Sequence, residues 1–239
     1  MSFVSNFRAD VFISYKHSDN QAGWISEFHR RLHVRLTELL GEEAVVWRDK
    51  KLGGADAFSD EILEQLKNTA LFVPVITPGY TVSEWCKKEL GEFQNGSASS
   101  GGLRVGNKLR IVKAVKTPME RDEHRQFEGD SLGYEFYERP NDSSDFREFH
   151  PDMPAFSEKL DSMAQEICRI LRAMRGQQKK EDRSKSAVYV AETTSDLKAQ
   201  RERIVDELQG HGYRVLPESE LPDDDEGCAA ASREAMQQA

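Results

Sequence analysis

The first 175 residues alternate between short apolar runs and amphipathic segments, and this alternation limits the possible folds more than any other feature. Residues 10–15 (DVFISY) form a β-branched apolar run. Apolar residues then recur at steps of three and four from Ile25 to Leu39, which is the period of a helix. Further strands are predicted over 44–47, 71–76, 109–115 and 133–137, and further helices over 59–68, 83–93 and 156–174. Strands that alternate with helices predict a doubly wound α/β fold, a parallel sheet with helices on both faces.

In sheets of this kind, ligands bind beyond the carboxyl ends of the strands, so the loops after these ends are the first places to look for a site. The loop after the strand over 71–76 leads into residues 83–90 (SEWCKKEL). Trp85 and Glu89 are four residues apart there and share one helical face. An indole that excludes water from a carboxylate raises the pKa of the acid. The same spacing also fits a tryptophan in the core and a surface glutamate paired with a lysine, and spacing alone leaves both interpretations open.

After residue 175 the pattern changes and then restarts. Residues 176–185 (GQQKKEDRSK) contain no apolar side chain and are predicted to be a solvated linker. Residues 186–239 then repeat the order strand, helix, strand, acidic loop, helix, which predicts a partial second α/β unit. Two strands are too few for an independent core, so this unit either depends on the first unit or is the truncated beginning of a larger one, and we favour truncation.

Composition excludes several classes of function. The chain has 33 Lys and Arg against 42 Asp and Glu, a net charge of −9, which argues against nucleic acid as a partner. No apolar run approaches the length needed to cross a bilayer, and the N-terminus has no signal-peptide pattern. The three cysteines are widely spaced and have no metal-ligand spacing. We therefore expect a cytoplasmic protein that carries no metal and no resident cofactor and makes no membrane contact.

Three segments occur in order and at consistent spacing: residues 10–15, residues 47–58 with Trp47-Arg48-Asp49 at their start, and residues 83–90. Together they resemble a Toll/interleukin-1 receptor (TIR) domain of the bacterial NAD-cleaving type, with residues 1–175 as the domain. The resemblance implies a flavodoxin-like, five-stranded parallel sheet. It also implies one of two functions, because many TIR domains cleave NAD+ to nicotinamide and ADP-ribose or a cyclic isomer, whereas others are adaptors that only self-associate.

The resemblance also assigns roles to individual residues. The catalytic residue of the family is a glutamate four residues after an aromatic, which here is Glu89 with Trp85. Tyr15 and Lys16 end the first strand, where the family contacts the dinucleotide. The loop that moves in this family runs from Asp49 to Phe58. Trp85 is also an expected substrate-binding position, and the remaining ones, Asp49, Gly54 and Phe58, lie in this loop.

One carboxylate fits the chemistry of this reaction. Cleavage of an N-glycosidic bond passes through an oxocarbenium-like transition state, and nicotinamide leaves from a cationic ring without needing a proton. We therefore expect a NAD+ glycohydrolase, with NAD+ as substrate, in immune (anti-phage) or stress signalling in bacteria. The expected partners are a second TIR domain and a sensor or effector region beyond residue 239. The alternatives are a non-catalytic adaptor module and a nucleoside deoxyribosyltransferase, which has a related fold and a carboxylate at the ribose.

Overall fold

The computed structural model describes residues 1–49, 60–119, 133–140, 145–194, 196–218 and 224–239. Contacts divide the chain into two compact units, Met1–Arg175 and Gly176–Ala239. We describe each unit by itself. None of the helices in these ranges has an apolar stretch long enough to cross a membrane.

The first unit is built on a five-stranded parallel sheet. Its strands, in spatial order, are β2 (Val46–Arg48), β1 (Ala9–Ser14), β3 (Thr69–Ile76), β6 (Ala114–Val115) and β7 (Tyr134–Glu135). Every neighbouring pair is parallel. All residues of β1 and β3 are buried, as expected for strands covered on both faces. The predicted doubly wound, flavodoxin-like fold is confirmed.

The last two predicted strands are shorter and more broken than expected. Over 109–115 the chain makes a single bridge from Ile111 to Phe72 before β6 begins. The residues before it form a small antiparallel pair, β4 (Arg104–Val105) with β5 (Lys108–Leu109). The run over 133–137 divides into β7 and β8 (Tyr137–Glu138), and β8 pairs antiparallel with β9 (Arg147–Glu148).

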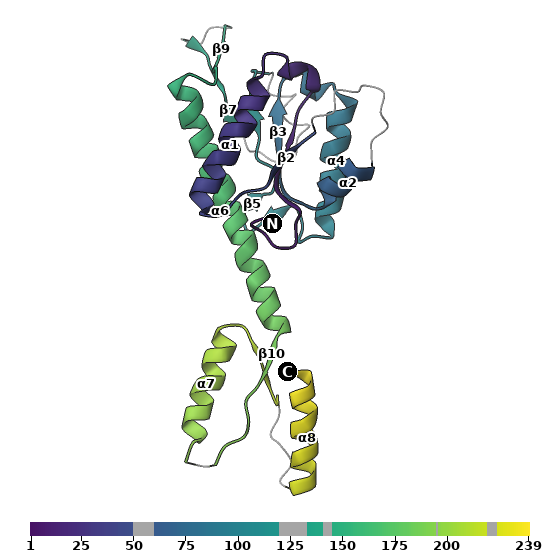
Figure 1. The fold of residues 1–239 in the computed structure, drawn as a ribbon, viewed down its shortest axis with the longest axis vertical. Coiled ribbons are helices and arrows are strands. Elements are labelled where there is room, and N and C mark those ends of the chain that lie inside the picture. The colour runs from purple at the N-terminus through teal and green to yellow at the C-terminus, as the bar shows by residue number, and fades with distance from the viewer. Residues whose placement is uncertain (50–59, 120–132, 141–144, 195, 219–223) are drawn as a thin grey trace. The chain divides into compact units, whose positions relative to one another are not determined.

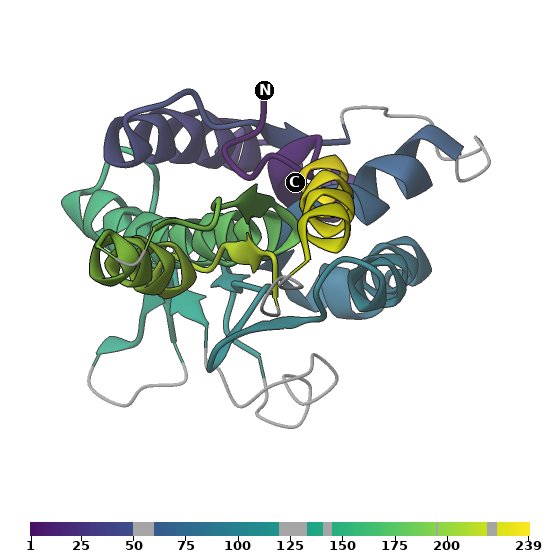
Figure 2. The same cartoon turned by 90° about the horizontal axis from the view of Figure 1, so that it is seen from below.

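Helices cover both faces of the sheet (Figure 1, Figure 2). Helices α1 (Trp24–Leu40) and α6 (Pro154–Lys185) pack on one face, and α2 (Asp60–Lys67) and α4 (Glu84–Ala98) pack on the other. Side chains alternate along β1, so Val11 and Ile13 join the α1/α6 core whereas Phe12 joins the α2/α4 core. Ser14 is two residues after Phe12, so its side chain lies on the same face of the sheet and points toward α4.

Two short helical segments shape the loops at the carboxyl end of the sheet. Segment η1 (His17–Asn20) follows β1, and α3 (Pro78–Thr81) follows β3. The Thr77 hydroxyl caps α3 by accepting from the backbone N–H of Tyr80, and Pro78 occupies the first helical position. Ser83 caps α4 in the same way, accepting from the N–H of Cys86.

Helix α4 continues to Ala98, beyond the end of the helix that was predicted over 83–93. Gly96 lies against α2, because a Cβ added there would lie 3.1 Å from the Cα of Lys67. The Ser97 hydroxyl donates to the carbonyl of Phe93 one turn earlier. Close contact between α2 and α4 therefore favours small residues in a helical conformation at this position.

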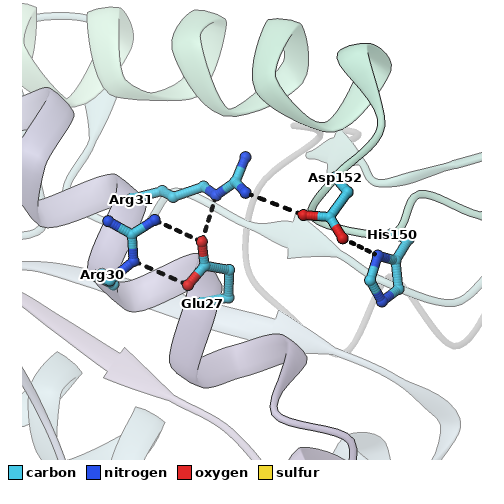
Figure 3. Close-up of polar contacts among 5 residues, drawn as sticks. All are labelled: Glu27, Arg30, Arg31, His150 and Asp152. Carbon is cyan, nitrogen blue, oxygen red and sulfur yellow. Dashed lines mark hydrogen bonds and ion pairs between the residues drawn. The ribbon is translucent and has the colours of Figure 1, made fainter.

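A cluster of charged residues joins α1 to the segment before α6 (Figure 3). Glu27 accepts hydrogen bonds from Arg30 at 2.9 and 2.6 Å and from Arg31 at 2.6 Å. Arg31 also reaches Asp152 at 3.5 Å, and Asp152 lies 3.3 Å from the His150 ring. Of these contacts, the one between Arg31 and Asp152 links α1 to the segment before α6 at the surface.

The second unit holds β10 (Ala187–Tyr189), α7 (Lys198–Gly210), β11 (Arg214–Leu216) and α8 (Asp225–Gln238). Strands β10 and β11 pair in parallel, and Asp224 caps α8 by accepting from the N–H of Gly227. Helix α7 buries none of its residues. The unit therefore has the strand–helix order expected from the sequence and a small core.

Residues 176–185 differ from the predicted linker, because α6 continues through them to Lys185. Most of these residues are Gln, Lys, Glu or Arg, which have high helix propensity. The lack of apolar side chains indicated exposure to solvent. It does not distinguish a solvated helix from a coil.

Candidate active site

The carboxyl ends of β1, β2 and β3 meet at one edge of the sheet, and the candidate site lies there. The order β2-β1-β3 places β1 at the point where the chain changes direction across the sheet, which is where ligands bind in this architecture. The predicted residues come from three segments at this edge: the end of β1, the end of β2 and helix α4.

Glu89 is the central acid of the site and is only 2% exposed. Its Oε1 accepts from the indole N–H of Trp85 at 3.0 Å, and its Oε2 accepts from the Ser14 hydroxyl at 2.5 Å. The first contact spans one turn of α4, and the second joins α4 to the end of β1. Both carboxylate oxygens are therefore held by neutral donors. The alternative in which Glu89 is a surface charge does not agree with this burial.

The pKa of Glu89 is raised to about 8, mainly by burial and in smaller part by the negative charge of Asp49. The hydrogen bonds from Ser14 and Trp85 act in the opposite direction and lower it. The indole therefore favours the ionised form of the acid, although the sequence suggested that the indole would raise the pKa. The exclusion of water by the surrounding core is what favours the neutral form.

The Ser14 hydroxyl has a second partner, the Tyr80 hydroxyl, at 2.9 Å. Both side chains are buried, at 1% and 0% exposure. Burial raises the pKa of Tyr80 well above its ordinary value, so this phenol stays neutral at physiological pH. A line of three oxygen-bearing groups thus runs from α3 through β1 to α4.

Tyr15 and Asp49 form a second cluster beside the first. Tyr15 is buried against the α1/α6 core, and its hydroxyl donates to the carbonyl of Asp49 at 2.7 Å. The Arg48 guanidinium donates to the same hydroxyl at 3.3 Å and lies over the Tyr15 ring. Burial raises the pKa of Tyr15, and the charges of Asp49 and Glu89 add to this effect. The two clusters are therefore electrostatically connected.

Lys16 lies at the edge of the site, between η1 and α3. Its side chain packs over Gly79, because a Cβ added at that glycine would lie 2.9 Å from the Lys16 Cδ and 3.3 Å from the Asp19 carboxylate. The next residue, His17, lies 3.9 Å from the buried Asp49 carboxylate. The end of β1 thus presents two basic side chains beside the acidic centre.

The structure brings Trp85 into direct contact with Glu89, and it places Tyr15 and Asp49 in the neighbouring cluster and Lys16 at the edge. Gly54 and Phe58 lie outside the described residues. Ser14, Tyr80 and Arg48 are contacts of the site that the sequence did not predict. Side-chain alternation along β1 is the one signal that would have directed Ser14 toward α4. Among the residues that the structure describes, no group of His, Cys, Asp or Glu is arranged to hold a metal ion.

Comparison with known proteins gives one family match. Residues 11–118 match the model of the TIR domain family. This range contains both clusters of the site. A solved structure, the TIR domains of the activated Roq1 resistosome directly recognizing the pathogen effector XopQ, is similar with 16% identity over 70% of this chain and 82% of that one. Its TM-score of 0.35 supports no conclusion about function. A search of curated proteins finds no match.

Proposed function

We propose that this chain is a NAD+ glycohydrolase that cleaves the bond between nicotinamide and ribose, because residues 11–118 match the model of the TIR domain family. The products are nicotinamide and ADP-ribose or a cyclic isomer, and the setting is immune or stress signalling. The observation that supports the proposal most directly is Glu89. It is a buried carboxyl group held by two neutral donors at the ligand-binding edge of the sheet.

The reaction needs a negative charge beside the ribose. As the bond to nicotinamide breaks, positive charge builds on the ribose carbon and ring oxygen. Nicotinamide carries its positive charge before cleavage and leaves as a neutral molecule, so no acid has to protonate it. A fixed carboxylate stabilises the positive charge of the transition state more than that of the ground state, which is the requirement for catalysis.

The neutral donors preserve the charge that this step uses. A carboxylate paired with arginine or lysine has much of its field cancelled by its partner. The groups that set the pKa of Glu89 are its burial, Ser14, Trp85 and Asp49, and none of these is a cation. With a pKa of about 8, Glu89 is mostly protonated at neutral pH in the free protein. A cationic nicotinamide ring placed beside it favours the ionised, active form.

The surrounding groups suit the rest of the dinucleotide. Lys16 and His17 supply positive charge or hydrogen-bond donors for a pyrophosphate at the end of β1, and the proposal assigns them this role. Tyr15 and Asp49 form the inner wall beside Glu89 in the proposal. Trp85 holds the carboxylate and offers an aromatic surface beside the reacting ribose.

The experiment is a nicotinamide-release assay on the full chain at high concentration with a crowding agent, since assembly of TIR domains is part of the proposal. Glu89→Gln keeps the volume of the side chain and removes its charge. We expect it to lower the rate by about a thousandfold or more, the scale of a lost electrostatic stabiliser. Glu27→Gln is the matched control, because it makes the same change in the α1 cluster and should leave the rate unchanged.

Each outcome separates the proposal from an alternative. Absence of release by concentrated wild-type protein overturns the enzymatic function and favours a self-association module. Release by Glu89→Gln at the wild-type rate overturns the assignment of the catalytic residue. Transfer of ribosyl groups between free nucleobases, with NAD+ untouched, favours a deoxyribosyltransferase.

A further inference from the structure

Ser14 occupies an unusual position between two oxygen-bearing side chains. Its Oγ lies 2.5 Å from Glu89 Oε2 and 2.9 Å from the Tyr80 hydroxyl oxygen. A serine hydroxyl carries one hydrogen, so it donates to one of these neighbours and accepts from the other. Ser14 therefore donates to Glu89 when Tyr80 supplies the other hydrogen, and it donates to Tyr80 when Glu89 supplies it.

Two arrangements satisfy the same heavy-atom positions. When Glu89 is ionised, Tyr80 donates to Ser14, and Ser14 donates to the carboxylate. When Glu89 is protonated, its own O–H donates to Ser14, and Ser14 donates to the Tyr80 oxygen. Between the two states Glu89 gains or loses one proton and the hydroxyl hydrogens rotate, while no bond between heavy atoms forms or breaks.

We propose that Ser14 and Tyr80 are positioning residues that hold Glu89 in one place in both of its charge states by reversing the direction of their hydrogen bonds. The proposal rests on the proposed function for its catalytic meaning, since the carboxyl group that they hold is the one assigned to the ribose. Neither residue contacts the reacting atoms. Their effect reaches the reaction through Glu89.

The elements around this pair are packed and buried. Ser14 is the last residue of β1, in register with Pro74 of the adjacent β3. Tyr80 lies in α3, whose start is fixed by the Thr77 cap. Because both side chains are at most 1% exposed, solvent cannot readily replace a lost hydroxyl. Groups held on packed elements keep the positions that a reversible pair of bonds requires.

The other titratable groups near Glu89 come from three segments. Tyr15 follows β1, Cys86 lies in the first turn of α4, and Asp49 follows β2. Burial raises the pKa of Tyr15 and raises that of Cys86 to about 12, so both stay neutral in the pH range where Glu89 ionises. His17 is the imidazole beside Asp49, and a His17→Gln background tests whether this side chain contributes.

The test is a direct titration of Glu89 by NMR in the full chain labelled with ¹³C at the glutamate carboxyl carbon. The signal that disappears in Glu89→Gln identifies the residue. Ser14→Ala should move the Glu89 midpoint upward by about one pH unit, because the hydrogen bond to the ionised acid is stronger than the one to the neutral acid. Tyr80→Phe should move it in the same direction by less than about one unit, because its hydroxyl acts through Ser14.

Matched controls distinguish this effect from a general loss of a buried hydroxyl. Ser97→Ala removes an equally buried serine hydroxyl of α4 that bonds to a backbone carbonyl, and it should leave the midpoint unchanged. Ser14→Thr retains a hydroxyl and should restore the midpoint toward the wild-type value. In the release assay, the pH of half-maximal kcat/KM should shift in parallel with the NMR midpoint.

The titration does not depend on activity, so the two proposals fail separately. An unchanged midpoint in Ser14→Ala overturns the positioning role even if the chain cleaves NAD+. A shifted midpoint in a chain that releases no nicotinamide supports the positioning role and overturns the proposed function. If Ser14→Ala does not fold, Tyr80→Phe carries the test. A midpoint unchanged in Tyr80→Phe overturns the reversible pair.

Discussion

The first unit contains two glutamates in opposite environments. Glu27 lies on α1 with a side chain that is 30% exposed, and it accepts hydrogen bonds from two arginines (Figure 3). These bonds lower its pKa to about 2. Glu89 is buried on α4 and is held by an indole and a serine hydroxyl. Its pKa is raised to about 8, with burial as the main cause. The same side chain is thus strongly acidic in one place and weakly acidic in the other.

The difference shows what each carboxylate contributes to the protein. Glu27 has its charge balanced by two arginines of its own helix, one of which, Arg31, also reaches Asp152 before α6. Glu89 has no balancing cation among the groups that set its pKa, so ionising it opposes folding. Burial of an uncompensated acid at a ligand-binding edge is typical of functional sites, where stability is lower than it would be with an apolar residue.

The largest expected effect is on the pH dependence of stability. The pKa of Glu89 is raised above its ordinary value of 4.5, so the folded chain keeps a proton that the unfolded chain has released. Stability from this group is present below pH 4.5 and is lost as the pH rises toward about 8. Glu89→Gln removes this loss. We expect the variant to gain several kcal/mol on wild type between about pH 5 and 8, since one pKa unit corresponds to about 1.4 kcal/mol.

Denaturant unfolding followed by tryptophan fluorescence reports on the first unit. The three tryptophans of the chain, Trp24, Trp47 and Trp85, all lie before residue 175. The stability of the Glu27→Gln variant should change with pH as steeply as that of wild type over the same pH range. Parallel curves for wild type and Glu89→Gln would show that Glu89 ionises as readily as an exposed glutamate. The contrast between the two acids would then be wrong.

The next effect concerns the indole that holds Glu89. Trp85→Phe keeps an aromatic ring and removes the N–H that donates to Oε1. A hydrogen bond to a charged group contributes about 1.5–3 kcal/mol, so kcat/KM at neutral pH should fall by about ten- to a hundredfold. The pKa of Glu89 should rise, because this bond lowers it in the wild type.

Trp24→Phe is the matched control for that change. It also removes an indole N–H bond, here to the Phe149 carbonyl at 2.9 Å on the α1/α6 side. It should lower stability without changing the pH profile of the release assay. A similar loss of kcat/KM in both variants would mean that the Trp85 effect comes from general destabilisation.

The fold and part of the site follow from local patterns in the sequence. The period of the apolar residues identifies the buried strands and the amphipathic helices, because each element must turn one face to the core. The four-residue spacing of Trp85 and Glu89 fixes their contact, since it needs only a regular helix. These features depend on residues close together in the chain.

The remaining contacts depend on packing between distant segments. Ser14 is separated by 75 residues from Glu89 and by 66 from Tyr80, and no local pattern fixes where α3 and α4 sit over β1. Tyr15 is two residues after Ile13, so its side chain lies on the same face of the sheet, toward the α1/α6 core. The resemblance predicted contact with substrate at this position, and that role stays a prediction.

A smaller effect is expected in the arginine-bound cluster. Glu27→Gln removes a carboxylate whose pKa is lowered from 4.5 to about 2. Stability from such a group is present above its unfolded pKa and is lost as the pH falls through the folded one. Because the cluster is open to solvent, we expect Glu27→Gln to cost less than about 1 kcal/mol near neutral pH. The difference from wild type should shrink as the pH falls and vanish only below about pH 2, where Glu27 is fully protonated. A constant difference down to that pH would assign the effect to packing.

Salt should produce the smallest effect and separates the two acids most cleanly. Raising the ionic strength from about 0.1 to 1 M shortens the screening length from about 10 to 3 Å, which weakens ion pairs that are open to water. The stability difference between wild type and Glu27→Gln should therefore shrink by a few tenths of a kcal/mol. The difference between wild type and Glu89→Gln at about pH 8 should not change, because it comes from burial, which ions in solution do not screen. If salt reduced both differences equally, Glu89 would have to be solvated as Glu27 is. The reason for proposing Glu89 as the catalytic group would then be lost.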